Sequence, residues 1–328
     1  ADSLLEIRDV SIGMNRHGRE IRIAESVDLK VGRGERVGLV GESGAGKSMV
    51  LRSIAGLLPR GVRVLSGSIM FNGRDLLTIS PSQRRKLMGP QIAMVFQEPM
   101  TALNPLMRVG DQIAEGSVRY QGLSRKQGRE RAIELMGRVG IPDPRRRARA
   151  YPHELSGGLR QRVMIAMAVS LSPSLLLCDE LTTALDVTIQ HQVLRLLEEL
   201  CDEVGAALLF VTHDLAVINQ TCRRLAVMYA GRICETGTTR EVLHDPRHPY
   251  TRGLLESAPD FDQPDREIVA IPGAAPNIVD RPAGCAFAPR CRDATDACLA
   301  TESVLRATSD GRQTSCIRAD ELFKKVTA

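Results

Sequence analysis

One eight-residue segment, Gly41-Glu42-Ser43-Gly44-Ala45-Gly46-Lys47-Ser48, restricts the possible folds most strongly. It matches the phosphate-binding loop pattern G-x-x-x-x-G-K-[S/T], and it lies between an apolar run over 37–40 and a helix predicted over 49–58. Glycines let successive backbone N–H groups point toward one anion at a helix N-terminus. Lys47 is expected to reach the β- and γ-phosphates, and the Ser48 hydroxyl to hold Mg²⁺. The agreement of strand, loop and helix disfavours a chance glycine-rich turn. The pattern predicts a nucleoside triphosphate site that consists of Gly41, Ser43, Gly44, Ala45, Gly46, Lys47, Ser48 and Met49.

Apolar runs and helical stretches alternate along most of the chain. Strands are expected over 4–10, 21–31, 37–40, 67–72, 92–96, 175–178 and 207–211. Helices are expected over 49–58 and 187–203, and a largely helical stretch over 106–169. Such alternation predicts an α/β fold with a parallel, doubly wound sheet that binds its ligand at the carboxyl ends of the strands. After about Leu243 the sequence becomes rich in proline and contains four cysteines.

Two acidic residues, Asp179 and Glu180, follow the apolar run over 175–178. An acid at the end of a buried strand is costly unless it serves a cation or a reaction. Asp179 is therefore expected to support the Mg²⁺ held by Ser48, and Glu180 to orient or deprotonate an attacking water. The alternative, that the pair only caps the next helix, is disfavoured by the phosphate loop upstream.

A second candidate anion site is Ser156-Gly157-Gly158, which precedes a helix predicted over about 159–171. A serine hydroxyl and glycine amides at a helix N-terminus can bind an anion, although Ser-Gly-Gly alone is most often a loop. Two such sites cannot easily grip one γ-phosphate from the same subunit. The pattern thus favours a dimer with ATP between the two subunits.

Composition limits the other possibilities. The 328 residues suffice for two domains, and 43% hydrophobic and 25% charged residues are typical of globular proteins. No apolar run is long enough for a membrane helix, and the first residues do not resemble a secretion signal. The net charge is only +5, the run over 145–149 is most simply a solvated arginine-rich loop, and tryptophan is absent, so nucleic acid is not an expected partner.

Six motifs in order make the chain resemble the nucleotide-binding subunits of ATP-binding-cassette (ABC) transporters. They are the Walker A motif over 41–48, the Q-loop residue Gln97, the signature over 155–161, the Walker B strand over 175–180, the D-loop over 184–186 and the H-loop residue His213. The resemblance implies an ATPase of the P-loop NTPase fold. It also implies a RecA-like core over 1–97 and 171–245, an inserted α-helical subdomain over 98–170 and a Cys-rich C-terminal extension over 246–328.

The resemblance assigns a role to each motif residue. Glu180 would be the general base, Gln97 would sense Mg²⁺ and the attacking water, and His213 would contact the γ-phosphate. Asp179 would support the metal ion. Ser156, Gly157 and Gly158, with Asp186 of the D-loop, would act on ATP held by a partner subunit. The chain departs from the family pattern at Leu159 and Leu181, and it lacks an aromatic residue over 12–17 to stack on adenine.

The C-terminal region resembles that of dipeptide and oligopeptide importers, most closely the D-type subunit. The matching stretches are His248-Pro249-Tyr250-Thr251 and Gly284-Cys285-Ala286-Phe287-Ala288-Pro289-Arg290-Cys291. The implied partners are a second, related ATPase subunit, two membrane permeases and, indirectly, an extracytoplasmic binding protein. The implied location is the cytoplasmic face of the inner membrane, as a peripheral subunit.

Cys285, Cys291, Cys298 and Cys316 are spaced C-x5-C-x6-C-x17-C. Disulfides are disfavoured in a reducing compartment, and a metal group would staple a segment too small to fold alone. Zinc is disfavoured by the absence of paired C-x2-C knuckles, whereas a [4Fe-4S] cluster tolerates irregular spacing. The resemblance also supports the cluster, because tails of this branch can hold one. Unligated thiols are the remaining alternative.

Two other functions stay open. Close relatives in the family import nickel, opines, glutathione or other small solutes, and an ATPase subunit does not touch its cargo. A soluble ABC ATPase that acts on ribosomes or DNA is disfavoured, because such proteins usually carry two cassettes or a long coiled-coil insertion. The leading hypothesis is therefore a motor that energises peptide import.

Overall fold

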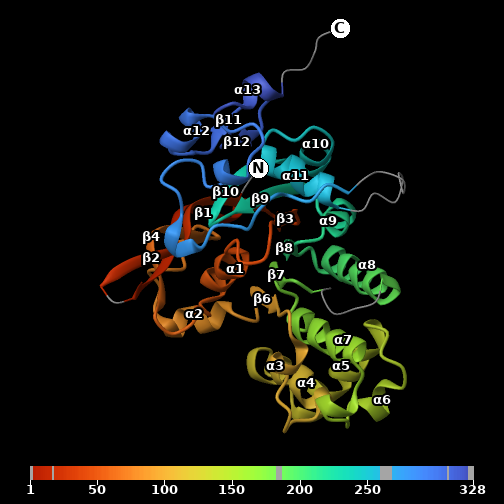
Figure 1. Ribbon diagram of the computed structural model, residues 1–328. Coiled ribbons are helices and arrows are strands. Elements are labelled where there is room, and N and C mark those ends of the chain that lie inside the picture. The colour runs from red at the N-terminus through yellow and green to blue at the C-terminus, as the bar shows by residue number, and fades with distance from the viewer. Residues whose placement is uncertain (1–2, 17, 182–186, 259–267, 309, 324–328) are drawn as a thin grey trace. The chain divides into compact units, whose positions relative to one another are not determined.

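The structure, a computed structural model, describes residues 3–16, 18–181, 187–258, 268–308 and 310–323 (Figure 1). The chain forms two compact units. The first unit consists of Ala1–Leu4, Val31–Glu35 and Thr78–Leu209, and the second of Leu5–Lys30, Arg36–Leu77 and Phe210–Ala328.

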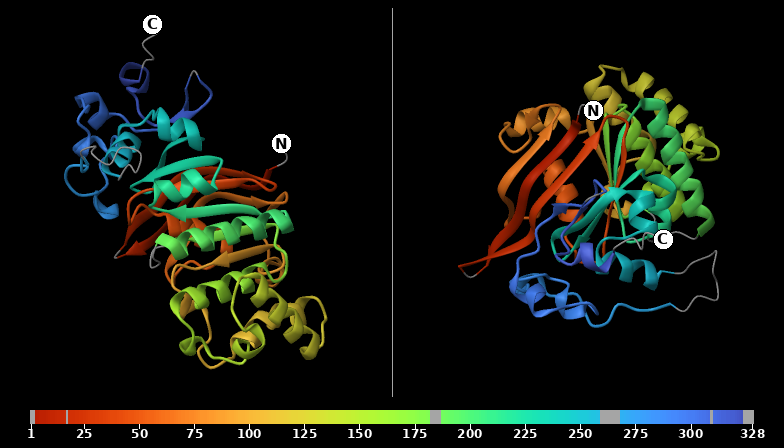
Figure 2. Two further views of the ribbon diagram at one scale, coloured as in Figure 1. Left: turned by 90° about the vertical axis from the view of Figure 1, so that its right-hand side faces the viewer. Right: turned by 90° about the horizontal axis from the view of Figure 1, so that it is seen from above.

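The second unit contains most of an antiparallel sheet of order β2-β1-β4-β5 (Figure 2). Its strands are β1 (Ser3–Arg16), β2 (Arg19–Gly32), β4 (Val62–Phe71) and β5 (Arg74–Asp75). Asn72 and Gly73 connect β4 to β5, both with positive φ, as a tight hairpin turn requires. Burial alternates along β2 from Val27 to Val31, and β1 is buried at Leu4, Leu5, Ile7 and over 10–13.

A second set of strands in this unit surrounds β3 (Arg36–Val40). β3 runs parallel to β9 (Arg224–Tyr229), with Val40 beside Val227, and β9 pairs antiparallel with β10 (Arg232–Thr238). The helices of the unit are α1 (Lys47–Ala55), α9 (Leu215–Thr221), α10 (Thr239–His244) and α11 (Pro249–Ser257). α10 begins at a capping box formed by Thr238 and Glu241.

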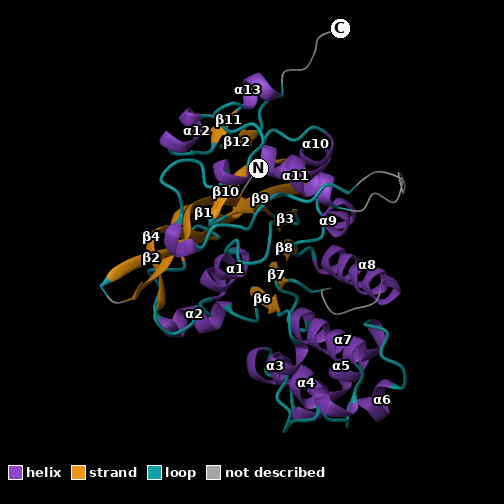
Figure 3. Ribbon diagram, viewed as in Figure 1, coloured by secondary structure: helices purple, strands orange, loops and turns teal. Residues whose placement is uncertain are grey.

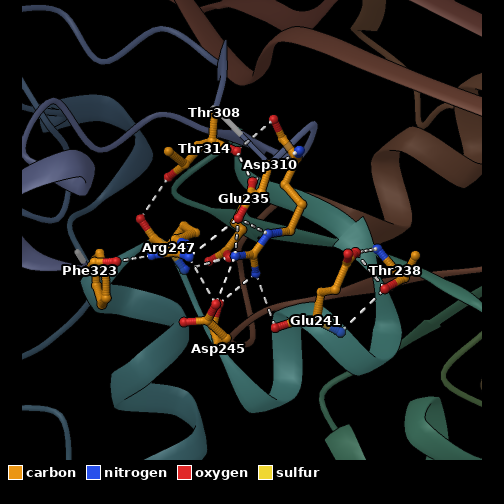
Figure 4. Close-up of polar contacts among 10 residues, drawn as sticks. Glu235, Thr238, Glu241, Asp245, Arg247, Thr308, Asp310, Thr314 and Phe323 are labelled. Atoms are coloured by element: carbon orange, nitrogen blue, oxygen red, sulfur yellow. Dashed lines mark hydrogen bonds and ion pairs between the residues drawn. The ribbon is translucent and has the colours of Figure 1, made fainter. Parts of the chain in front are cut away.

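The C-terminal residues of this unit add short elements around β10. They are η2 (Ile278–Asp280), η3 (Ala288–Arg290), α12 (Asp296–Ala300), β11 (Arg306–Ala307), β12 (Gln313–Thr314) and α13 (Ala319–Leu322). β12 pairs antiparallel with β10 through Glu235 and Thr314. Figure 4 shows the polar network beneath this pairing, in which Arg247 bonds Asp245 and Asp310 and donates to the Phe323 carbonyl. The network connects Phe323 and Asp310 to the residues that follow α10.

The first unit contains the parallel strands β6 (Ile92–Val95) and β7 (Leu175–Asp179), with Val95 beside Cys178. β8 (Ala207–Thr212) starts in this unit, where the Ala207 N–H donates to the Ser174 carbonyl, and it ends in the second unit. β7 and β8 are buried along their whole length, as expected for strands covered on both faces. The last residues of these two strands, Asp179 and Thr212, are therefore buried.

The helices of the first unit are shown in Figure 3. They are α2 (Pro81–Leu87), α3 (Pro99–Ala102), α4 (Val109–Tyr120), α5 (Arg125–Arg138), α6 (Pro144–Arg147), η1 (Pro152–Glu154), α7 (Gly157–Val169) and α8 (Val187–Val204). The stretch between β6 and β7, which is described throughout, contains no strand. Ser80 and Ser124 form capping boxes at the starts of α2 and α5.

Several predicted elements are confirmed and others need correction. The strands do not form one parallel sheet, because β1, β2, β4 and β5 form a separate antiparallel sheet and β10 runs against β9. α1 ends at Ala55 rather than residue 58, because Gly56 adopts a left-handed conformation with φ 73° and stops the helix. β4 begins at Val62, five residues before its predicted start. Nowhere in the described ranges is there a helix long and apolar enough to cross a bilayer.

Candidate nucleotide site and cysteine cluster

The predicted phosphate loop connects β3 to α1 in the second unit. Gly46 precedes the helix with φ 99°, and no side chain caps the first turn of α1. The N–H groups of Met49 and Val50 donate to the Gly46 carbonyl, and the positive end of the helix dipole at this turn favours an anion. Gly41 has φ 155°, and a Cβ there would lie 2.0 Å from the Met228 carbonyl oxygen, so only glycine fits. The backbone of the loop has the form that phosphate binding requires.

Lys47 is turned back over this loop. Its ammonium group donates to the carbonyl oxygens of Gly41, at 2.7 Å, and of Glu42, at 3.0 Å, and its side chain is buried. A phosphate that replaced these two acceptors would bring negative charge to a desolvated cation, which strengthens their attraction. Ser48 lies in the first turn of α1, directly after Lys47, and Met49 follows it.

Asp179 and Glu180 lie at the end of β7 in the first unit. Asp179 is 2% exposed, whereas Glu180 is half-buried and has φ 44°. A left-handed backbone at a non-glycine residue is strained, and such strain concentrates at functional sites. The strain turns Glu180 out of the strand direction that Asp179 still follows.

The structure brings two predicted catalytic residues of this unit together. Gln97 follows β6, and its side-chain amide donates to the Glu180 carboxylate, Nε2 to Oε2, at 3.0 Å. This hydrogen bond from a neutral amide orients the carboxylate and brings no opposite charge to it. A carboxylate in this form can accept a proton from water.

The predicted second anion site, Ser156-Gly157-Gly158, lies at the start of α7. The helix begins at Gly157, two residues before its predicted start, and Ser156 is its N-cap residue with an extended backbone. The Ser156 side chain makes no capping hydrogen bond, and both Ser156 and Gly157 are exposed. An exposed hydroxyl and exposed amides at a helix N-terminus suit an anion from outside the subunit.

Two predicted site residues remain, His213 and Asp186. His213 follows β8 in the second unit and is exposed, and the next residue, Asp214, caps α9 by accepting from Ala216 and Val217 N–H groups. Asp186 of the predicted D-loop lies outside the described residues.

One contact lies at Leu181, where the sequence departs from the family pattern. The buried side chain of Gln161, in α7, donates to the Leu181 carbonyl directly after the acidic pair. Leu181 itself is 2% exposed. The contact ties α7 to the end of β7.

The four C-terminal cysteines line one largely apolar pocket in the second unit. Cys285, Cys291, Cys298 and Cys316 share it with Phe287 and Ile317. The Cys285 N–H donates to the Cys298 carbonyl at 2.8 Å. Burial raises the pKa of Cys316 to about 11 and also raises the pKa of Cys291. In the part of the chain that is described, no set of three or more Cys, His, Asp or Glu side chains is arranged to hold a single metal ion.

Three residues that the sequence did not single out as site residues meet at the phosphate loop. Arg290, of the C-terminal segment, pairs with Glu42 inside the loop, and the Tyr250 hydroxyl accepts from the Glu42 N–H. Tyr250 and Arg290 belong to the two stretches that resemble peptide importers, which was the available sign of their importance. The pairing itself spans 248 residues and has no local pattern.

Comparisons with known proteins agree with these features. A family model described as "ABC transporter" matches residues 24–183, and one described as "Oligopeptide/dipeptide transporter, C-terminal region" matches residues 234–298. The dipeptide transport ATP-binding protein DppD of Escherichia coli is 46% identical over 314 residues, 96% of each chain. The oligopeptide transport ATP-binding protein OppD of Bacillus subtilis is 45% identical over 289 residues, 88% of this chain and 81% of its own.

Solved structures support the same conclusion. The dimeric ATP-binding cassette MJ0796 bound to ADP and Pi has a TM-score of 0.65 and 26% identity, over 72% of this chain and 99% of its own. The structure of cbiO1 from Clostridium perfringens, part of the transporter complex cbiONQ, has a TM-score of 0.62 and 26% identity, over 74% and 91%. With 46% identity to DppD along nearly the whole chain, this protein belongs to the ABC transporter family, as an ATPase subunit of its dipeptide and oligopeptide branch.

Proposed function

We propose that the chain is the motor subunit of a membrane importer for dipeptides or short oligopeptides. The observation that carries this proposal is the full-length similarity to DppD, joined to the match of residues 234–298 to the oligopeptide and dipeptide transporter C-terminal region. ATP hydrolysis would supply the free energy, and the permeases would form the path for the peptide. Importers of nickel, opines or glutathione remain the alternative, because no residue of this subunit meets the cargo.

Each residue of the nucleotide site receives a role in this proposal. The loop over 41–48 and Met49 would hold the phosphates, with Lys47 on the β- and γ-phosphates and Ser48 on Mg²⁺. Asp179 would fix the magnesium shell, and Gln97 would complete it. Glu180 would accept the proton of the attacking water, and His213 would contact the γ-phosphate. Hydrolysis of this kind depends on orientation and charge rather than on covalent intermediates.

The exposed start of α7 would complete a site in another subunit. Ser156, Gly157 and Gly158 would bind the γ-phosphate of ATP held by a second, related ATPase, and Asp186 would lie near the same interface. The exposure of Ser156 and its lack of a capping bond support this role. Closing of the ATPase heterodimer would switch two permeases between their inward- and outward-facing forms, and hydrolysis would reopen it. The subunit would therefore lie at the cytoplasmic face of the inner membrane, and a peptide-binding protein would act on the other side.

The domain division that accompanies this function has three parts. Residues 1–97 and 171–245 would form the RecA-like core, and 98–170 the helical subdomain that carries the signature. Residues 246–328 would form the C-terminal extension. The stretch between β6 and β7 contains helices and no strand, which supports the helical subdomain. The short elements around the cysteines support the C-terminal extension.

We infer that the four cysteine residues hold a [4Fe-4S] cluster rather than a zinc ion. A zinc ion binds each sulfur at about 2.3 Å, so the four thiols would have to converge on one point. The described side chains show no such convergence, although all four thiols line one pocket. A four-iron cluster is larger and reaches cysteines at the walls of a pocket. Cys285, Cys291, Cys298 and Cys316 would hold it as thiolates, and it would supply a covalent staple for the extension.

Reconstitution tests the transport function. The chain, its partner ATPase and both permeases are placed in vesicles with the cognate binding protein, and uptake of a labelled dipeptide is measured with ATP. ATP-dependent dipeptide uptake that Lys47→Ala abolishes supports the proposal. Uptake of nickel or glutathione but not of dipeptide would show that the proposed cargo is wrong and that the proposed motor role is right. Full dipeptide uptake with Lys47→Ala would overturn the motor role.

A further inference from the structure

Glu42, the second residue of the phosphate loop, is held by an arginine from the C-terminal segment. Two guanidinium nitrogens of Arg290 donate to the two carboxylate oxygens of Glu42, at 2.7 and 3.0 Å. The Arg290 side chain is 7% exposed and that of Glu42 28%. A two-point bond of this kind fixes both the position and the orientation of a carboxylate, and it is among the stronger side-chain contacts.

The backbone of the same residue has a second contact from the C-terminal segment. The Glu42 N–H donates to the Tyr250 hydroxyl at 2.9 Å, and Tyr250 is fully buried. The Glu42 carbonyl in turn accepts from the Lys47 ammonium at 3.0 Å. Glu42 therefore connects residues 250 and 290 to the lysine of the phosphate loop through three of its polar groups.

Arg290 itself has a rigid setting. Its Nε donates to the Pro272 carbonyl at 2.8 Å, and one of its terminal nitrogens donates to the Tyr229 hydroxyl at 3.2 Å. Its guanidinium also lies over the Tyr229 ring, 5.8 Å from the centroid. Tyr229 packs against Tyr250 and Phe287, with ring centroids 4.4 and 5.3 Å away. These contacts hold the guanidinium of Arg290 in one place beside Glu42.

A carboxylate in a phosphate loop needs such a partner. ATP brings a polyanion to this loop, and an unpaired Glu42 would oppose it by like-charge repulsion. The hydrogen bond to Glu42 is the largest of the causes that raise the Arg290 pKa, which agrees with a persistent ion pair. The Glu42–Arg290 ion pair has no net charge, so the positive charge of Lys47 remains available to attract phosphate.

From these contacts we propose that Arg290 is a positioning residue of the nucleotide site: it neutralises and orients Glu42, so that the phosphate loop reaches full ATP affinity only with the C-terminal segment in place. This inference rests on the proposed nucleotide site and goes beyond it, because it assigns a function to a residue distant from every family motif that touches ATP. Arg290 acts through Glu42 and touches no phosphate.

The test is a double-mutant cycle on the full chain, with a non-hydrolysable ATP analogue and Mg²⁺ as the probe. Arg290→Gln leaves Glu42 charged and unpaired, and we expect its Kd to rise about tenfold, which corresponds to about 1.4 kcal/mol. Glu42→Gln removes the charge that needs neutralising, so its Kd should rise less than that of Arg290→Gln. The double variant should regain most of the affinity that Arg290→Gln loses, and Arg290→Lys should lose less than Arg290→Gln.

Arg252→Gln is the matched control. Arg252 comes from the same segment, lines the same pocket beside Arg290 and pairs with Asp293 rather than with the loop. Its Kd should equal the parent value. A purely structural role of Arg290 would make the double variant as weak as Arg290→Gln, and that result would overturn the proposal, as would an unchanged Kd in Arg290→Gln. A parent chain that binds no nucleotide would instead refute the nucleotide site itself.

Discussion

The amide of Gln97 and the carboxylate of Glu180 are joined by a 3.0 Å hydrogen bond, although 83 residues separate them. The bond joins the ends of neighbouring parallel strands, β6 and β7, in the first unit. The left-handed backbone of Glu180 completes this arrangement, because it directs the side chain away from the strand axis. A strained acid with a neutral amide partner is consistent with a general base.

The first prediction concerns this acid. Glu180→Gln keeps the size of the side chain but cannot accept a proton, so ATP turnover of the assembled complex should fall by about 10²- to 10³-fold. Binding of ATP should persist, because Lys47 and the loop backbone are untouched. Steady-state phosphate release and equilibrium ATP binding measure the two effects. Turnover near the parent rate would count against Glu180 as the base.

The second prediction concerns the steric need for Gly41. A Cβ at this position would lie 2.0 Å from the Met228 carbonyl, so Gly41→Ala must displace either β9 or the loop. We expect a loss of about 1–3 kcal/mol in stability and a marked loss of ATP affinity. Thermal melting and ATP titration provide the measurements.

Gly61→Ala is the control for that experiment. Gly61 has φ 83°, yet a Cβ there would meet no atom within 4 Å. Gly61→Ala should lower the stability only by the strain of a left-handed alanine backbone, and it should leave ATP affinity unchanged. Equal loss of ATP affinity in both variants would show that the close approach at Gly41 is unimportant.

The third prediction is a pH dependence that arises at Glu235. This side chain is fully buried in β10, and burial raises its pKa to about 7 although it accepts the Arg247 N–H at 2.6 Å. Between pH 4.5, its ordinary value, and about 7, the folded chain keeps a proton that the unfolded chain has released. The free energy of unfolding therefore falls as pH rises through this window, by at most about 3 kcal/mol.

Glu235→Gln removes this titration and retains an oxygen acceptor. Its melting temperature should exceed that of the parent protein by more at pH 8 than at pH 5. Glu241→Gln is the control, because contacts with Thr238 lower the pKa of Glu241, so that it is ionised across the whole window. Its difference from the parent should be the same at both pH values. A parent and a Glu235→Gln variant with parallel curves would refute the raised pKa.

The fourth prediction tests the cysteine cluster. A Cβ on Gly284 would lie 2.3 Å from the Leu299 carbonyl oxygen and 2.5 Å from that of Cys298. Gly284→Ala should therefore separate Cys285 from Cys298 and abolish iron binding. Iron and sulfide analysis after anaerobic purification, with the visible absorption spectrum, gives the readout.

Gly311→Ala serves as the control in the same segment, because a Cβ there meets no atom within 4 Å. It should retain iron at the parent level. A parent protein that is folded, colourless and free of iron would rule out the cluster, whatever the variants do.

The parts of the fold that sequence could predict are those with local causes. Runs of apolar residues over 4–10 and 21–31 predicted strands that lie within β1 and β2. The direction of neighbouring strands was harder to predict, because an apolar run such as 225–229 does not indicate whether the strand beside it runs parallel or antiparallel. The end of α1 was missed because Leu57 and Leu58 continue the apolar pattern after Gly56 has stopped the helix.

The same distinction holds for the site. The loop over 41–48 could be predicted, because the spacing of its glycines and lysine is itself the requirement for binding phosphate. The contacts of Gln161 with Leu181 and of Arg290 with Glu42 could not, since each joins residues that only the folded chain brings together. Arginine is common on surfaces, and nothing adjacent to Arg290 in sequence marks it as buried.

The separation of 248 residues between Glu42 and Arg290 has a consequence for folding during translation. A ribosome makes the N-terminal part first, and domains generally fold in that order. The phosphate loop therefore leaves the ribosome long before the arginine that neutralises it has been translated. A nascent chain would carry an unfinished loop until late in its synthesis, which delays tight nucleotide binding until nearly the whole polypeptide exists.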